Sequence, residues 1–130
     1  MSALVIDTNV YSGFLRGDDR AVRALRAAHE IHLPLVALAE LLAGFAAGTR
    51  TARNREELAR FMASPRVHLL LPDAKTADHY ADVFAALRRQ GTPIPANDLC
   101  IAALARQHRV PLFSFDDHFG TVPGLALHRP

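Results

Sequence analysis

The 130-residue sequence has no tryptophan, a single cysteine and a single lysine. One cysteine, Cys100, excludes an internal disulfide framework and any metal site built from a cysteine cluster. No apolar run approaches the roughly 18 residues that cross a membrane, and the apolar stretch near the N-terminus ends at Asp7 with no basic region before it. We therefore expect neither a signal peptide nor a membrane contact. We expect the protein to be cytoplasmic.

The composition is that of an ordinary globular chain, with 50% hydrophobic and 22% charged residues. We expect one domain, residues 1–130, because two domains would each be close to the lower size limit for a stable core. Lysine and arginine exceed aspartate and glutamate by 15 − 13 = +2, an excess too small to assign a partner. Fourteen of the 15 basic residues are arginine, which suits phosphate, although genome composition produces the same bias.

Short apolar runs alternate with helical patterns along the whole chain. Residues 4–6 are apolar without alternation, which is typical of a strand buried on both faces of a parallel sheet. We expect strands at residues 4–6, 31–35, 67–71 and 110–115, with a short fifth at 125–128. We expect helices near residues 8–15, 20–29, 36–47, 50–63, 73–90 and 96–108, and a loop or turn at 116–124. This order predicts a three-layer α/β fold with a mostly parallel central sheet of four or five strands.

Four acidic residues stand where charge is otherwise rare. Asp7 and Asp116 each follow an expected strand. Glu40 is the only charged residue between positions 33 and 47, and Asp98 is the only one between positions 94 and 105. An unpaired acid among apolar neighbours is costly, so each needs water, a cation or a hydrogen-bond partner. Ligands of parallel α/β sheets bind beyond the carboxyl ends of the strands, so we expect the four acids to converge there.

Four carboxylates at one edge would repel one another unless cations were present. Mg²⁺ and Mn²⁺ prefer oxygen ligands, and one or two such ions can activate water and stabilise the leaving oxygen in phosphodiester hydrolysis. Each acid also has a purely structural interpretation. Asp7 and Asp98 could cap helices, Glu40 could lie on a solvated stripe, and Asp116 could be a turn residue. The metal-site hypothesis therefore depends on the four together, and it identifies neither the number of ions nor the general base.

Four motifs in sequence order cover nearly the whole chain: Val5-Ile6-Asp7-Thr8-Asn9-Val10, Leu38-Ala39-Glu40-Leu41, Ile94-Pro95-Ala96-Asn97-Asp98-Leu99-Cys100-Ile101-Ala102-Ala103 and Ser114-Phe115-Asp116-Asp117-His118-Phe119. Together they resemble the PIN-domain family, in particular the VapC-type toxin ribonucleases of type II toxin–antitoxin pairs. The resemblance implies a metal-dependent endoribonuclease that hydrolyses RNA phosphodiester bonds, with Mg²⁺ or Mn²⁺ held by Asp7, Glu40, Asp98 and Asp116. It also implies a supporting role for Ser114. Asp117 leaves the fourth acid ambiguous, but the register of the motif favours Asp116 and makes Asp117 a supporting residue.

The resemblance further implies partners that composition and periodicity do not reveal. Toxins of this family act on RNA, and a small VapB-type antitoxin blocks their acidic site. They are commonly homodimers within a toxin–antitoxin hetero-oligomer. The sequence specifies neither the RNA target and its cleavage site nor the identity of the antitoxin.

Smaller features are open to two interpretations. Thr8 and Asn9 could hydrogen-bond Asp7 or a water molecule in the site, or could only cap a helix. The arginines of residues 20–26 could follow RNA phosphates, although a solvated helix face is the more usual role. His118 could lie at the rim of the site, although a histidine in a surface loop is the more usual case.

Two other functions are alternatives to a ribonuclease. A receiver-like signalling domain also gathers acids at strand ends around Mg²⁺, and it accepts phosphate on an aspartate. Such a domain would need paired acids near its first strand and a lysine late in the chain, whereas the only lysine of this chain is Lys75. The second alternative is a catalytically inactive PIN-fold binding module, which the presence of all four acids disfavours.

Overall fold

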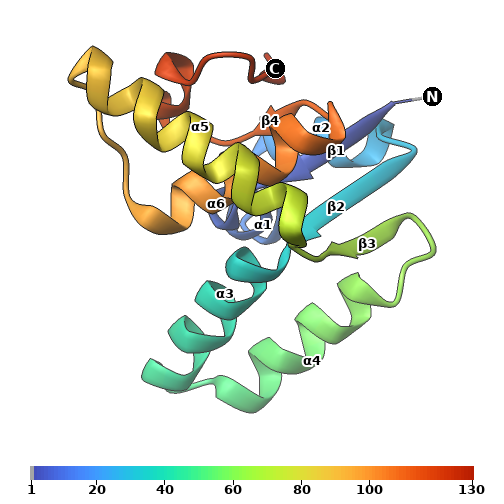
Figure 1. Cartoon of the computed structure of the whole chain (residues 1–130). Helices are drawn as coiled ribbons and strands as arrows, with labels where there is room; N and C mark the ends of the chain where they lie inside the picture. The colour runs from blue at the N-terminus through green and yellow to red at the C-terminus, as the bar shows by residue number, and fades with distance from the viewer. Residues whose placement is uncertain (1) are drawn as a thin grey trace.

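The computed structural model describes residues 2–130 and contains a four-stranded sheet that is parallel throughout. The strands are β1 (Ala3–Ile6), β2 (Glu30–Pro34), β3 (Val67–Leu70) and β4 (Leu112–Phe113), in the spatial order β3-β2-β1-β4. The first strand therefore lies inside the sheet, paired with β2 on one side and β4 on the other (Figure 1). The predicted α/β class is confirmed, with all strand pairs parallel.

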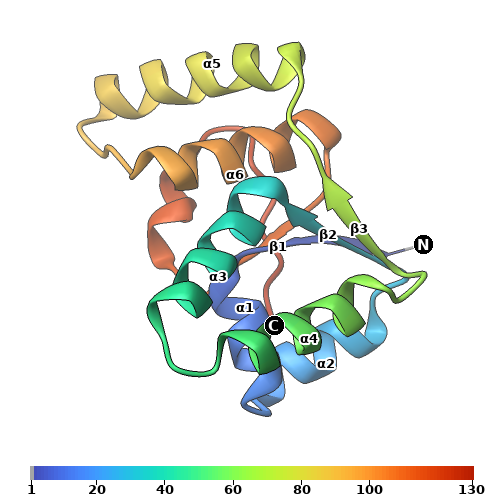
Figure 2. The same cartoon turned by 90° about the horizontal axis from the view of Figure 1, so that it is seen from below.

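Six helices connect the strands and cover the sheet. They are α1 (Thr8–Leu15), α2 (Asp19–Ala27), α3 (Leu35–Ala47), α4 (Thr51–Met62), α5 (Ala74–Gln90) and α6 (Ala96–His108). Figure 2 shows α5 and α6 on one side of the sheet and α1, α2 and α4 on the other, as the three-layer prediction requires. The helix α3 continues directly from β2 and runs beside α4 (Figure 1). Over residues 2–130, no helix is long and apolar enough to cross a membrane.

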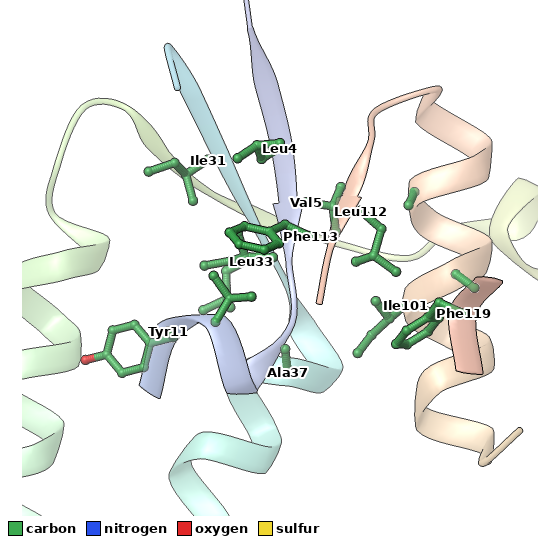
Figure 3. Close-up of a cluster of buried hydrophobic side chains, with 14 of the residues drawn as sticks. Leu4, Val5, Tyr11, Ile31, Leu33, Ala37, Ile101, Leu112, Phe113 and Phe119 are labelled. Atoms are coloured by element: carbon green, nitrogen blue, oxygen red, sulfur yellow. The ribbon is translucent and has the colours of Figure 1, made fainter. Parts of the chain in front are cut away.

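The hydrophobic core lies on both faces of the central strands. Successive side chains of a strand point to opposite faces, and the two residues of β4 do so (Figure 3). Phe113 points to the side of Tyr11 and Leu33, whereas Leu112 lies beside Ile101 of α6. All five side chains are almost completely buried. The core thus fixes α1 and α6 against the same two strands, β1 and β4, whose carboxyl ends lead to predicted acids.

The strand β4 is shorter than the predicted strand at residues 110–115 and spans only Leu112–Phe113. Beyond it, the backbone N–H of Phe115 is donated to Oδ1 of Asn9 at 3.1 Å instead of to a neighbouring strand. This hydrogen bond from the backbone to a side chain therefore ends the backbone pairing of β4 early, although the apolar composition of residues 110–115 favours a longer strand.

The segment after β4 also differs from the prediction. Residues 125–128 form no fifth strand of their own, because only Leu127 makes an isolated parallel bridge, to Leu112. The expected loop at 116–124 contains a short 3₁₀ helix, η1, at Asp117–Thr121. The side chain of Phe119 within it is 1% exposed and anchors this turn to the core. Burial of one aromatic side chain therefore gives regular structure to a stretch of turn-forming residues.

Tyr11 is a buried residue whose hydroxyl makes no hydrogen bond with the part of the chain that the structure describes. Its ring packs edge-on against Phe61 at a centroid distance of 5.0 Å, and its hydroxyl points toward α4 (Figure 3). Burial, together with the nearby charge of Glu57, raises the pKa of Tyr11 to about 12. The aromatic ring therefore stabilises the fold, whereas the hydroxyl is desolvated without compensation.

Replacing Tyr11 with Phe should raise the free energy of unfolding by about 1 kcal/mol, because it removes an unpaired hydroxyl and keeps the ring. The sign of the pH dependence follows from the raised pKa. The Tyr11 hydroxyl has a pKa near 10.0 in the unfolded state and a pKa of about 12 in the folded state. The wild type thus loses stability over that interval, whereas Tyr11→Phe does not. Urea unfolding at neutral and alkaline pH measures both effects, with Tyr80→Phe as the control. A variant less stable than the wild type at neutral pH would contradict the interpretation.

Candidate active site

Four elements bring the four predicted acids to one hollow beyond the carboxyl ends of β1 and β4. Asp7 follows β1, Glu40 lies on α3, Asp98 lies in the first turn of α6, and Asp116 lies between β4 and η1. These helices meet at this end of the sheet (Figure 2). The hollow has a volume of about 460 Å³ and is lined by Asp7, Thr8, Asn9, Glu40, Pro95, Ala96, Asn97, Asp98 and Asp116. Residues separated by most of the chain thus share one surface.

Asp7 is the most buried of the four acids, with 3% of its surface exposed. It is the N-cap of α1, and its Oδ1 accepts hydrogen bonds from Thr8 N at 2.8 Å and Thr8 Oγ1 at 3.2 Å. Its Oδ2 accepts a hydrogen bond from Ser114 Oγ at 2.8 Å. The sequence is compatible with either role for Asp7, and in the structure this residue both caps α1 and lines the hollow.

Ser114 and Asn9 join the end of β1 to the segment that carries Asp116. The hydroxyl of Ser114 donates to Asp7 and accepts from the backbone N–H of Asp116 at 3.0 Å and from Asn9 Nδ2 at 3.3 Å. It therefore uses its one donor and both acceptor positions. Asn9 also accepts from the backbone N–H of Phe115 at 3.1 Å. This network sets the position of the fourth acid relative to the first.

Glu40 faces the hollow from α3, and its Oε1 is buried without a hydrogen-bond partner among residues 2–130. Burial raises the pKa of this carboxyl, the nearby side chain of Asn97 lowers it, and the negative charges of Asp7 and Asp98 raise it further. A buried carboxylate oxygen with no donor is an unfavourable arrangement in the chain alone. The orphaned oxygen therefore points to a partner that the protein chain does not supply.

Asp98 is half-buried, and burial raises its pKa, as does the charge of Asp7. The side chain of His118 acts in the opposite direction, because its Nε2 lies 2.8 Å from Asp98 Oδ2. The Nδ1 of the same ring lies 3.7 Å from Asp116 Oδ1. The expected surface-loop histidine is thus half-buried between two of the acids. The only sequence signal for this position is its place two residues after Asp116.

Asp116 and Asp117 differ in what they face. The side chain of Asp116 is 52% exposed and lies at the rim of the hollow. Asp117 is the first residue of η1 and lies outside that lining, against a second hollow of about 70 Å³ that Asp116, His128 and Arg129 also line. The motif register favours Asp116 as the fourth acid, and of the two residues only Asp116 lines the hollow of the other three acids.

Two of the arginines within residues 20–26, which could follow RNA phosphates, are paired with neighbouring acids. Arg20 Nη2 lies 3.1 Å from Asp18 Oδ2, and Arg23 Nη2 lies 2.6 Å from Asp19 Oδ2. Most of these side chains are exposed, and exposed pairs of this kind contribute little to stability. The pairing favours the solvated-helix interpretation over a surface dedicated to RNA phosphates.

The donor set of the hollow fits a hard divalent cation. All four acids supply oxygen, which is the ligand that Mg²⁺ and Mn²⁺ prefer. The buried orphan oxygen of Glu40 and the mutual repulsion of the acids would both be relieved by positive charge. Within residues 2–130, ligand atoms of Asp98, Asp116 and His118 also lie within 4.8 Å of one another, so these three side chains could hold an ion together.

Comparison with known proteins finds a matching family model and similar chains over nearly the whole length of the sequence. The model of the PIN domain family matches residues 4–125. Ribonuclease VapC5 of Mycobacterium tuberculosis is 29% identical over 125 residues, which cover 96% of this chain and 91% of that protein.

Two solved structures extend this comparison. The structure of VapBC-5, a member of the VapBC family of toxin–antitoxin systems from Mycobacterium tuberculosis, is 29% identical with a TM-score of 0.72, and the match covers 97% of this chain and 94% of that chain. VapBC2 from Rickettsia felis, bound to a DNA fragment from its promoter, has a TM-score of 0.88 at 24% identity, and the match covers 97% of both chains. At that identity, the second likeness shows the fold alone.

Proposed function

Because the chain belongs to the PIN domain family, we propose that it is a divalent-metal-dependent endoribonuclease that acts as the toxin of a VapBC-type pair. The observation that carries this proposal is the convergence of Asp7, Glu40, Asp98 and Asp116 on one hollow. The likeness to a protein named Ribonuclease VapC5 over 96% of the chain supports the activity. The likeness to the solved structure of VapBC-5 from Mycobacterium tuberculosis supports the toxin–antitoxin context.

In this proposal, Asp7, Glu40, Asp98 and Asp116 hold Mg²⁺ or Mn²⁺. The bound cation would supply positive charge that polarises the scissile phosphate and lowers the pKa of the attacking water. Without a cation, four acids in one hollow would repel a polyanionic substrate. The acids therefore bind the cation, and RNA binds only when the cation is present.

The surrounding residues orient this acidic set. The three hydrogen bonds from Thr8 and Ser114 hold both oxygens of Asp7 in fixed directions. The bonds from the backbone to Ser114 and Asn9 hold the segment of Asp116. The exposure of Asp116 leaves the rim accessible to a long substrate. Thr8, Asn9 and Ser114 thus act as positioning residues. For Asp117 we propose a supporting role beside Asp116.

The partners proposed for this chain are RNA, a small VapB-type antitoxin that blocks the acidic hollow, and a second copy of the chain. An antitoxin suits such a site if it places a basic side chain among the carboxylates, since that charge would take the place of the cation. Toxin and antitoxin would then form a hetero-oligomer around a toxin homodimer. An adjacent reading frame that encodes a short protein with a DNA-binding head and a polar tail would support this part of the proposal.

The test is incubation of the purified full chain with a transcript of bacterial ribosomal RNA in Mg²⁺, in Mn²⁺ and in EDTA. We expect cuts at discrete positions with either metal and none in EDTA. An intact transcript under all conditions would favour the inactive binding module. Transfer of phosphate from acetyl phosphate onto an aspartate, with the transcript intact, would favour the receiver-like domain.

A further inference from the structure

His118 is the one nitrogen donor among the described groups of this acidic cluster, and the four-acid site gives it no role. We propose that His118 is a direct ligand of the cation, so that Asp98, Asp116 and His118 form a mixed nitrogen–oxygen site that selects Mn²⁺ or another first-row transition ion over Mg²⁺. This inference rests on the metal site of the proposed function. It adds a ligand and a metal preference that four carboxylates alone do not imply.

The distances between the side chains suit a shared ion. Two ligand atoms that are each about 2.1 Å from one ion are roughly 3 Å apart when adjacent and about 4.2 Å apart when opposite. The Nε2 of His118 lies 2.8 Å from Asp98 Oδ2, which is an adjacent-ligand separation. The Nε2 atom nevertheless makes no aligned hydrogen bond with any described residue. All three ligand atoms lie within 4.8 Å of one another, so small side-chain rotations are sufficient to enclose an ion.

The backbone around His118 holds the imidazole in this place. Its carbonyl accepts a hydrogen bond from Thr121 Oγ1 at 2.9 Å, which closes the turn of η1. The next residue, Phe119, is 1% exposed and lies beside Ile101 of α6 (Figure 3). Ile101 follows Asp98 by three residues, about one helical turn. The same α6 surface therefore carries one acid and anchors the segment that presents the histidine, which is the preorganisation that a ligand set needs.

The chemistry of imidazole decides the metal preference. Mg²⁺ takes oxygen ligands at near-ideal octahedral geometry and keeps several of its waters. A neutral imidazole nitrogen suits first-row transition ions, whose affinity for a nitrogen-containing site exceeds that of Mg²⁺. A histidine that only balanced the charge of Asp98 would leave an all-oxygen site. The two roles therefore differ in whether nitrogen enters the coordination shell.

The first experiment is calorimetric titration of the full chain with Mn²⁺ and with Mg²⁺, for the wild type and for His118→Ala. We expect the Mn²⁺ affinity of His118→Ala to fall roughly tenfold or more, with a smaller change for Mg²⁺. The preference for Mn²⁺ would therefore collapse. The matched control is His108→Ala, since His108 is exposed at the far end of α6 and should leave both affinities unchanged. Circular dichroism establishes that each variant is folded.

The second experiment is pulsed electron paramagnetic resonance on the Mn²⁺-loaded protein. We expect a coupling to ¹⁴N in the wild type and in His108→Ala, and no such coupling in His118→Ala. Absence of the coupling in the wild type overturns the inference, as does an unchanged preference for Mn²⁺ in His118→Ala. If Asp98→Asn loses metal binding while His118→Ala keeps it, His118 is not a ligand and the proposed function stands. If the wild type binds neither ion, the metal site of the proposed function fails as well.

Discussion

Replacing Asp98 with Asn should lower the rate of RNA cleavage by about two orders of magnitude or more while the fold stays intact. The amide has nearly the same shape as the carboxylate, but it removes one negative charge from the set that holds the cation. Asp98 is a cleaner choice than Asp7, because Asp7 also caps α1 and accepts a bond from Ser114. The substitution removes no capping interaction of α6, because the N-cap of this helix is Pro95, which makes no side-chain hydrogen bond.

The rate is measured by single-turnover cleavage of a labelled transcript at saturating Mn²⁺, with Asp78→Asn as the matched control. Asp78 is an exposed acid on α5 outside the lining of the hollow, so the control should cleave at the wild-type rate. Circular dichroism and thermal unfolding report whether the fold is preserved. Wild-type cleavage by Asp98→Asn would remove this residue from the site, and equal loss in Asp78→Asn would indicate a nonspecific effect of charge.

The fold was largely predictable because the buried parallel strands have a plain sequence signature. Residues 4–6 and 31–35 are short and largely apolar, and the structure places β1 and β2 within one residue of those bounds. Capping residues also mark the ends of helices in the structure. Asp73 caps α5 through a reciprocal pair of bonds with Thr76, and Gly91 ends this helix with a φ of 74°. Local chemistry of this kind is readable before any tertiary contact is known.

The region after β4 was less predictable because tertiary contacts decide its conformation. Phe115 reads as a strand residue, yet its backbone N–H is bound by Asn9, which lies more than a hundred positions earlier in the chain. Burial of Phe119 shapes η1 and turns His118 toward Asp98. Neither contact has a local pattern that marks it. For the same reason, the sequence indicated the four acids but left His118 open between the rim of the site and a surface loop, and the structure places it between two of the acids.

Metal binding should raise the melting temperature of the wild type by roughly ten degrees at saturation. A cation that binds only the folded site adds RT ln(1 + [L]/Kd), which is about 2.7 kcal/mol at 100 times Kd, and a domain of this size gains ~3–5 °C per kcal/mol. The effect is expected because the negative charges of Glu40 and Asp98 are buried and repel neighbouring acids when no ion is bound. Burial and neighbouring acids raise the pKa of both carboxyls.

Glu40→Gln separates this repulsion from metal binding. A raised carboxyl pKa means that the ionised form destabilises the folded state at neutral pH, and that this cost is relieved as the pH falls through the folded pKa. The metal-free variant should therefore melt above the metal-free wild type at neutral pH, and this advantage should disappear in acid. Its metal-induced shift should be smaller than that of the wild type, because one ligand charge is gone.

Thermal melts of both proteins in EDTA, Mg²⁺ and Mn²⁺ measure all of these differences together. Identical wild-type curves in the three solutions would count against a preformed cation site. Equal metal shifts in the wild type and Glu40→Gln would place the ion away from α3. A metal-free variant that melts below the wild type would mean that Oε1 of Glu40 has a stabilising partner in the apo protein. These melts test the unpaired oxygen and the cation together. The unpaired Glu40 oxygen destabilises the metal-free protein, and a bound cation would remove that destabilisation by pairing with it.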